Sequence, residues 1–153
     1  MNTINPYLTF DGNCREAFEL YKEAFGGDFD FIGEFGDMPA NDEFAIGEGD
    51  KKKIMHVSLH ISKETTLLGS DRLDGFGPPF VQGNNSSVSI NCTEESEAYR
   101  LFEVLSKGGN INMPLQKTFW AALYGMFTDR FGVHWMINHE YPEHADFEKQ
   151  GKA

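Results

Sequence analysis

The sequence of 153 residues has only two cysteines, and neither lies at metal-ligand spacing from another cysteine or a histidine. Basic residues are few, 13 against 24 acidic ones, so the formal net charge is −11 at pH 7. Nucleic-acid binding needs clustered Lys and Arg, and the one such run is residues 51–53. No window approaches the roughly 20 apolar residues of a membrane span, and no signal peptide is visible. We expect a cytoplasmic protein with reduced thiols that binds neither nucleic acid nor membrane.

The motifs of several enzyme classes are also missing. The chain has no Gly-x-Gly-x-x-Gly after a strand-like run, no phosphate-cradling Gly-Lys-Ser/Thr loop and no Gly-x-Ser-x-Gly elbow. Dinucleotide, P-loop and serine-hydrolase chemistry are therefore unsupported. Aromatic residues, by contrast, make up 14% of the chain, which is typical of a folded domain with a substantial core.

Two similar passages lie 81 residues apart. Residues 16–27 read EAFELYKEAFGG and residues 97–109 read EAYRLFEVLSKGG, so each opens on Glu-Ala-aromatic and closes on a Gly-Gly pair. Each follows a short strand-like run, NPYLTF at residues 5–10 and SSVSINC at residues 86–92. Because a repeat at about half the chain length indicates one unit used twice, we predict a pseudo-symmetric α+β fold.

Hydrophobic periodicity predicts the same order of elements in both halves. The first half has a strand at 5–10, a helix at 14–25, and strands at 28–35, 54–61 and 65–70. The second half has a strand at 87–92, a helix that Thr93 caps and that runs to about residue 106, and strands at 110–113, 120–128 and 133–138. We therefore predict modules at residues 1–70 and 86–139, separated by a Gly/Pro-rich linker at 71–85 and followed by a charged tail at 140–153.

The βαβββ unit used twice resembles the vicinal oxygen chelate superfamily, which includes glyoxalase I, extradiol dioxygenases and bleomycin-resistance proteins. Residues 5–27, 54–61 and 113–138, together with Ser70-Asp71, are similar to its PhnB-like branch. The resemblance implies cupped mixed sheets that enclose a cavity, and usually a homodimer. Members of the branch have often carried a demethylubiquinone methyltransferase label. The chain has no Gly-rich first turn of a nucleotide-type cofactor fold, so the label has no support here.

The resemblance also implies where a divalent metal would be held. Metal-bearing members use a His or Gln near the start of each module's first strand and a Glu late in each module's last strand. The matching positions here are Asn5 or Pro6, Gly69 or Ser70, Ser87, and Met136. None is a good ligand for such an ion. We predict that the usual metal site is lost and that no cofactor is bound.

Alternation in the strand at 54–61 places His56, Ser58 and His60 on one polar face, which either lies in solvent or lines a cavity. The two histidines are about 13 Å apart at about 3.3 Å per residue, so one ion could bridge them only with both rings stretched toward it. A three-histidine site with His134 is the alternative to hydrogen-bonded, cavity-lining histidines. The histidines of the tail region, His139 and His144, are expected in solvent.

Aromatic residues of the second module have two interpretations. Trp120, Tyr124 and Phe127 are predicted on one long strand, where a Trp or Tyr lining a cupped sheet can stack on a flat ligand. The alternative is that they belong to the core or to a dimer interface. Trp135 shares a face with Ile137 and is predicted to pack under the helices.

Two functions remain open. The first is a metal-independent binding protein for a small organic ligand, with a cavity lined by Tyr7, His56, Ser58, His60, Ser87, Ser89, Trp120 and Tyr124. The second is a lyase or dioxygenase of the same superfamily, with a rearranged metal site or a metal-free mechanism in which His56 or His60 carries the proton. A carboxylate such as Glu34 or Glu43 beside a histidine would favour the enzyme. A pure interaction protein is also compatible with the acidic composition.

Overall fold

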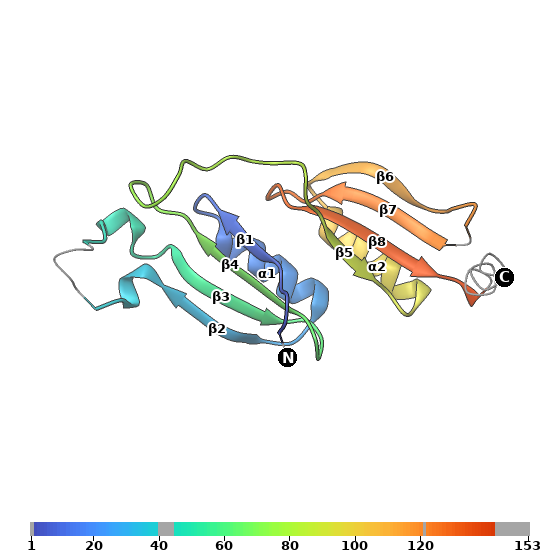
Figure 1. Cartoon of the computed structure of the whole chain (residues 1–153), viewed down its shortest axis with the longest axis horizontal. Helices are drawn as coiled ribbons and strands as arrows, with labels where there is room; N and C mark the ends of the chain where they lie inside the picture. Colours follow the sequence, from blue (N-terminus) through green and yellow to red (C-terminus); the bar gives the residue numbers. More distant parts are fainter. Residues whose placement is uncertain (1, 40–44, 121, 143–153) are drawn as a thin grey trace. The chain divides into compact units, whose positions relative to one another are not determined.

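The computed structural model describes residues 2–39, 45–120 and 122–142. The chain divides into two compact units, Met1–Val81 and Gln82–Ala153. Unit 1 contains β1 (Tyr7–Phe10), α1 (Cys14–Phe25), β2 (Phe29–Glu34), β3 (Ile54–His60) and β4 (Thr66–Asp71), with 3-10 turns at Phe35–Asp37 and Glu48–Asp50 (Figure 1). Unit 2 contains β5 (Val88–Asn91), α2 (Glu95–Ser106), β6 (Asn110–Lys117), β7 (Ala122–Thr128) and β8 (His134–Glu140).

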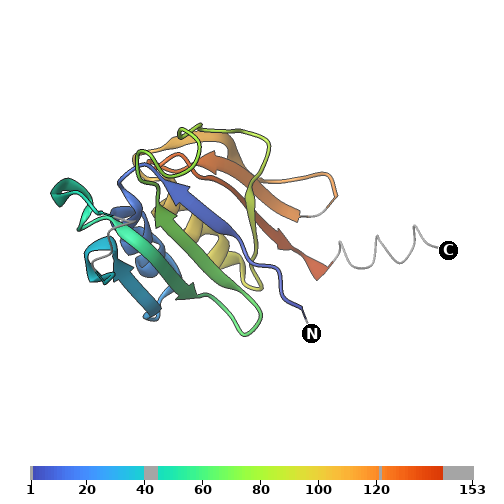
Figure 2. The same cartoon turned by 60° about the vertical axis from the view of Figure 1, so that its left-hand side comes forward.

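Each unit has one four-stranded mixed sheet, ordered β1-β4-β3-β2 in unit 1 and β5-β8-β7-β6 in unit 2. The last three strands form an antiparallel meander. The first strand joins in parallel beside the last, as Figure 2 shows for β1 and β4. The α+β class with two βαβββ modules is therefore confirmed. Neither sheet closes on itself within the described ranges, and the enclosed cavity stays a prediction.

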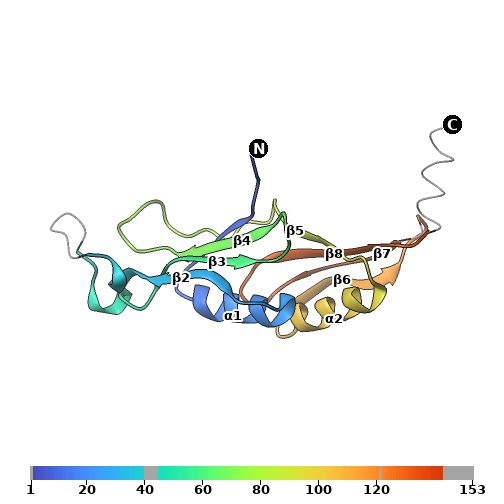
Figure 3. The ribbon, with the colours of Figure 1, turned by 90° about the horizontal axis from the view of Figure 1, so that it is seen from below.

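Within residues 2–39, 45–120 and 122–142, a helix covers one face of each sheet and no helix covers the other (Figure 3). Helix α1 buries Phe18 against β4, where Gly69 permits the contact: a Cβ at residue 69 would lie 2.5 Å from the Phe18 ring. The Gly-Gly pairs follow both helices as predicted. Gly26 and Gly108 have φ of +77° and +79°, a left-handed conformation that favours glycine and ends a helix.

A buried aspartate braces unit 1. Asp71, at the end of β4, is 4% exposed. Its Oδ1 accepts hydrogen bonds from the backbone N–H groups of Gly12 at 3.0 Å and Cys14 at 2.9 Å, and its Oδ2 accepts one from Ile54 at 2.8 Å. One carboxylate thus ties the start of α1 and the start of β3 to β4, because a buried charge must be compensated by several donors.

Unit 2 has a second buried aspartate at a different place, the turn between β7 and β8. Asp129 is 3% exposed, and its Oδ1 accepts hydrogen bonds from the N–H groups of Phe131 and Val133. Its Oδ2 accepts one from the indole Nε1–H of Trp135 at 2.9 Å. Trp135 is 1% exposed, which agrees with its predicted packing in the core.

Several boundaries in unit 2 differ from the prediction. Strand β6 continues to Lys117 instead of ending at Met113, because Pro114 lies in an edge strand, where its missing N–H is tolerated. Strand β7 begins at Ala122, so Trp120 lies in the β6–β7 connection and not on the strand. Helix α2 begins at Glu95, so the N-cap position is held by Glu94 and not by Thr93 as expected.

The described helices α1 and α2 have 12 residues each, and neither is long and apolar enough to cross a membrane.

Candidate functional site

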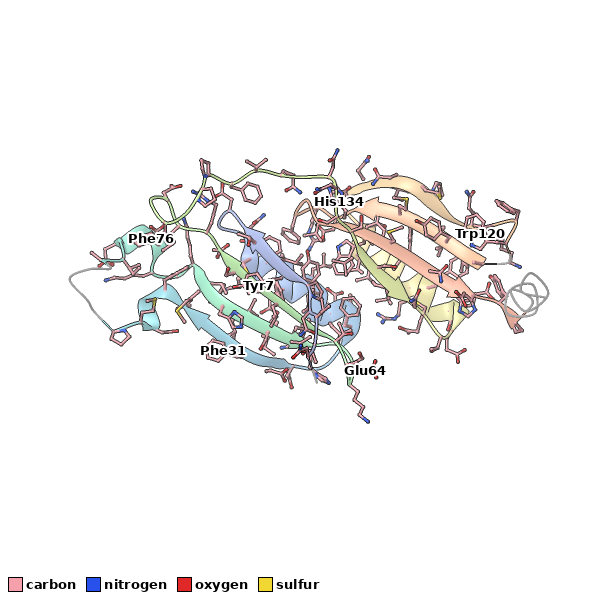
Figure 4. All side chains as sticks on the ribbon, viewed as in Figure 1. Tyr7, Phe31, Glu64, Phe76, Trp120 and His134 are labelled. Carbon is pink, nitrogen blue, oxygen red and sulfur yellow. The ribbon has the colours of Figure 1, made fainter. Side chains whose placement is uncertain are left out.

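An aromatic cluster lies on the helix-free face of the unit 1 sheet. The Tyr7 hydroxyl oxygen is 3.5 Å from His56 Nδ1, and the two rings stack with centroids 5.9 Å apart. The Phe31 ring centroid lies 6.0 Å from that of His56. Tyr7 and Phe31 are 50% and 49% exposed, and Figure 4 labels both on the same sheet. The three side chains form an aromatic surface that solvent can reach.

A β-bulge places Phe31 in this cluster. Phe29 pairs with Leu59, and the next paired residue is Phe31, opposite Ser58, so Asp30 is an extra residue in β2. In a regular strand Phe29 and Phe31 would lie on the same face of the sheet. Because the extra residue shifts the alternation by one, Phe31 lies on the opposite face from Phe29. Sequence reasoning missed Phe31 because alternation assigns it to the face of Phe29.

His60 lies at the exposed end of β3, apart from the aromatic cluster. Its Nδ1 is 3.9 Å from Asp30 Oδ2, and both side chains are more than half exposed. The proposed partner Glu34 is held elsewhere, because its carboxylate accepts a hydrogen bond from Arg15 at 2.6 Å. Glu43 lies outside the described residues. Among the described side chains, no group of three or more His, Cys, Asp or Glu is placed to hold a metal ion.

In unit 2 the predicted site residues are less closely grouped. Ser89 in β5 and Tyr124 in β7 are paired with the β8 residues Met136 and Asn138. Ser87 is exposed and precedes β5. The Trp120 ring, at the end of the sheet in Figure 4, lies 6.3 Å from that of Tyr124. Phe127, predicted on the same strand, is completely buried.

His134 uses both of its ring nitrogens within unit 2. Nε2 lies 2.9 Å from the Gly83 carbonyl oxygen and must donate to it, which leaves Nδ1 to accept from the Thr128 hydroxyl at 2.8 Å when the ring is neutral. Neither nitrogen is left for a metal ion in this arrangement.

The prediction for His139 is wrong. The side chain is half-buried, and its Nδ1 lies 2.9 Å from the Cys92 carbonyl oxygen, so it joins the end of β8 to the end of β5. His144 lies outside the described residues.

The positions implied for a divalent metal do not supply a suitable donor set. Asn5 Oδ1 accepts the backbone N–H of Thr66 at 3.0 Å, and Gly69, which has no side chain, packs against α1. Ser87 is an exposed hydroxyl, and Met136 offers a soft thioether. These residues do not fit the ion of the metal-bearing members, which prefers imidazole and carboxylate.

Neither cysteine is an activated nucleophile. Burial raises the pKa of the Cys14 thiol to about 12, and the nearby Asp71 carboxylate adds to the effect. Burial also raises the pKa of Cys92, with a further contribution from Glu97. Both thiols are free and carry their proton at neutral pH, as expected for structural cysteines.

The fold consists of two βαβββ units, and each unit has one helix on one face of a mixed sheet. This is the tandem βαβββ class that the sequence repeat predicts. The family model described as "Glyoxalase/Bleomycin resistance protein/Dioxygenase superfamily" matches residues 3–137. The chain belongs to this superfamily.

Three individual proteins illustrate the relationship. Protein YjdN of Escherichia coli (strain K12) is 31% identical over 137 residues, which cover 88% of this chain and 93% of YjdN. The crystal structure of protein PA1353 from Pseudomonas aeruginosa has a TM-score of 0.80 at 44% identity, covering 92% of this chain and 98% of the other. A putative 3-demethylubiquinone-9 3-methyltransferase, PhnB protein, from Bacillus cereus has a TM-score of 0.70 at 22% identity, covering 90% and 99%; at that identity the likeness shows the fold alone.

Proposed function

We propose that the chain binds a small, flat organic molecule on the helix-free faces of its sheets, without a divalent metal. The observation that carries the proposal is the aromatic surface formed by Tyr7, His56 and Phe31. Aromatic rings that stay half exposed on a folded sheet are candidates for stacking against a ligand. The rings offer a flat apolar surface, and the Tyr7 hydroxyl and His56 add polar groups that can orient the bound molecule.

The proposed ligand contacts in unit 1 are Tyr7, His56, Ser58 and His60, with Phe31 added. The contacts in unit 2 are Ser87, Ser89, Trp120 and Tyr124. Stacking on one aromatic ring contributes about 0.5–1.5 kcal/mol beyond the buried area, so removal of one ring corresponds to a loss of affinity of roughly twofold to tenfold.

Variant Tyr7→Ala tests the proposal. A library of flat organic compounds is screened by thermal shift and ligand-observed NMR, and the Kd of each hit is compared between variants. Tyr99, on helix α2, is 49% exposed and is a matched control for Tyr7 at 50%. We expect Tyr7→Ala to weaken binding by roughly tenfold and Tyr99→Ala to leave it unchanged. The proposal would be refuted if no compound binds, or if the Kd of every hit is unchanged by substitution of Tyr7 and of Phe31.

The His60–Asp30 pair favours a second candidate, a lyase or dioxygenase of the superfamily. In the metal-free form, His60 would carry a proton and Asp30 would orient its ring. In the metal-dependent form, a rearranged site in unit 1 would use His56 or His60, because both ring nitrogens of His134 are engaged within unit 2. Elemental analysis of chain purified without chelator, followed by titration with zinc, nickel, manganese and iron, separates the two forms. Stoichiometric metal that is lost in His56→Ala or His60→Ala would replace the binding proposal with a metal enzyme.

We also propose a cytoplasmic homodimer, with module boundaries near residues 70 and 86. The family resemblance supports the dimer, and so do large apolar side chains that lie almost fully in solvent: Ile4 and Phe119 are each 96% exposed and Val81 is 81% exposed. Light scattering coupled to size-exclusion chromatography should give twice the 17.3 kDa chain mass. A monomer at micromolar concentration would rule the dimer out.

A further inference from the structure

Three methionines lie in one row across the unit 2 sheet. Met113 of β6 pairs with Met126 of β7, and Met126 pairs with Met136 of β8. Residues directly opposite on antiparallel strands point to the same side of the sheet, with Cβ atoms about 4.5–5.5 Å apart. All three side chains are half-buried, so the row is reachable from solvent. Three thioethers therefore stand next to one another on the helix-free face.

A β-bulge brings Met113 into the row. Ile111 pairs with Phe127, and the next paired residue is Met113, opposite Met126, which leaves Asn112 as an extra residue. In a regular strand Met113 would share the face of Ile111, which is opposite the buried Phe127. The bulge reverses this, and Asn112 Nδ2 donates to Thr128 Oγ1 at 3.2 Å beside it.

The three sulfur atoms can meet at a single ion. A methionine sulfur lies on the order of 4 Å from its own Cα by standard bond geometry, and paired Cα atoms are about 4.5–5.5 Å apart. We place the ion above Met126, at about 2.3 Å from each sulfur, which is the distance in sulfur-ligated zinc sites. The side chains of Met113 and Met136 reach this ion when they lean toward Met126. Methionine has three rotatable bonds, so this convergence needs no change in the backbone.

The surroundings of the row select the kind of ion. The neighbouring side chains on the same face are neutral; they are Ser89, Tyr124, Thr128 and Asn138, placed there by the strand pairing. Both nitrogens of His134 are engaged, so the donors left at the row are thioethers. Neutral thioethers are poor ligands for hard divalent ions and select soft ones such as Cu(I).

We propose that Met113, Met126 and Met136 bind one soft monovalent cation, Cu(I), for which Ag(I) is a redox-inert substitute. This site is separate from the organic-ligand surface around Tyr7, and it uses donors that the superfamily's divalent sites do not require. Its metal chemistry is also separate from the divalent ions that test the enzyme candidate.

The probe is Cu(I), titrated anaerobically into the full chain in competition with a colorimetric Cu(I) chelator. A Cys92→Ser background removes the half-buried thiol, and Cys14 is completely buried. We expect one equivalent of Cu(I), and a loss of affinity of at least tenfold in Met126→Leu, which keeps the side-chain volume and removes the sulfur. Met38→Leu, a methionine in unit 1 with 37% exposure, is the matched control and should bind as the parent does.

The pH dependence identifies the donors. A thioether carries no proton, so the Cu(I) affinity should not change between pH 7 and pH 5, whereas a thiolate or imidazole site weakens because its ligands must be deprotonated. Ag(I) should shift the methyl NMR signals of Met113, Met126 and Met136, and not that of Met38.

Three results would overturn the site: no Cu(I) binding by the parent, equal binding in Met126→Leu, or an affinity that falls with pH. Met113→Leu, on the edge strand, gives a second variant if Met126→Leu does not fold. Binding of organic ligands that depends on Tyr7 is measured separately, so failure of one proposal does not imply failure of the other.

Discussion

Replacing Asp71 with alanine should destabilise unit 1 strongly. The substitution removes the acceptor of three backbone N–H groups, those of Gly12, Cys14 and Ile54. Gly12 is exposed, so water can replace its lost bond, but Cys14 and Ile54 are both completely buried. Two buried donors are then left without an acceptor, and each costs about 1–3 kcal/mol.

The expected loss in the free energy of unfolding is therefore about 2–6 kcal/mol, a large part of the roughly 5–15 kcal/mol that stabilises a typical domain. Asp71→Asn should lose less, about 2 kcal/mol. Its single carbonyl oxygen can still accept from Gly12 and Cys14, but its NH₂ group then faces the N–H of Ile54, donor against donor.

Urea unfolding measures these values, with far-UV circular dichroism following the whole chain. Both tryptophans, Trp120 and Trp135, lie in unit 2, so their fluorescence reports that unit. The matched control is Glu97→Ala, which removes an exposed ion pair with Arg100 and should cost under about 0.5 kcal/mol. A loss below about 1 kcal/mol in Asp71→Ala would refute the bracing role of the carboxylate.

Two further predictions concern unit 1. Gly69→Ala places a Cβ 2.5 Å from the Phe18 ring and should lower the free energy of unfolding, measured in urea, by about 1–3 kcal/mol. The control is Gly49→Ala, which should be nearly neutral because no atom lies within 4 Å of its added Cβ. Equal effects of the two substitutions would contradict the close packing of α1 against β4. Above pH 9 the unfolded Cys14 thiol releases its proton while the folded thiol, with a pKa of about 12, retains it. The free energy of unfolding should therefore fall by about 1.4 kcal/mol per pH unit from pH 9 toward pH 12, and Cys14→Ala should abolish that part of the slope; an unchanged slope would show that the thiol is not the group responsible.

Much of the fold could be predicted from the sequence because the information is local. The 3.6-residue periodicity and the Gly-Gly pairs define both helices, and the repeat doubles the evidence for the order of elements. The end of β6 could not be read in the same way. Pro114 signals a break in a strand, and only the order of the sheet, with β6 at the edge, shows that a proline is tolerated there.

The candidate site was only partly predictable. Tyr7, His56 and Ser58 follow from alternation, since the irregularity of β3 lies before His56, between its pairing with Gly33 and the pairing of Ile54 with Glu34. Phe31 was missed because a bulge depends on pairing with another strand, and no single-strand pattern shows it. His139 was assigned to solvent because its partner, the Cys92 carbonyl, is distant in the sequence.

One of the register shifts in each unit gives the two units different chemistry on equivalent faces. Both occur in the strand that follows the helix, at Asp30 in β2 and at Asn112 in β6. Each turns the next side chain to the helix-free face, where unit 1 gains the aromatic ring of Phe31 and unit 2 gains the thioether of Met113. In both units the residue after the extra one therefore lies on the helix-free face, and this residue is Phe31 in unit 1 and Met113 in unit 2. The proposed aromatic surface of unit 1 and the proposed methionine site of unit 2 thus each depend on one extra residue in the strand that follows the helix.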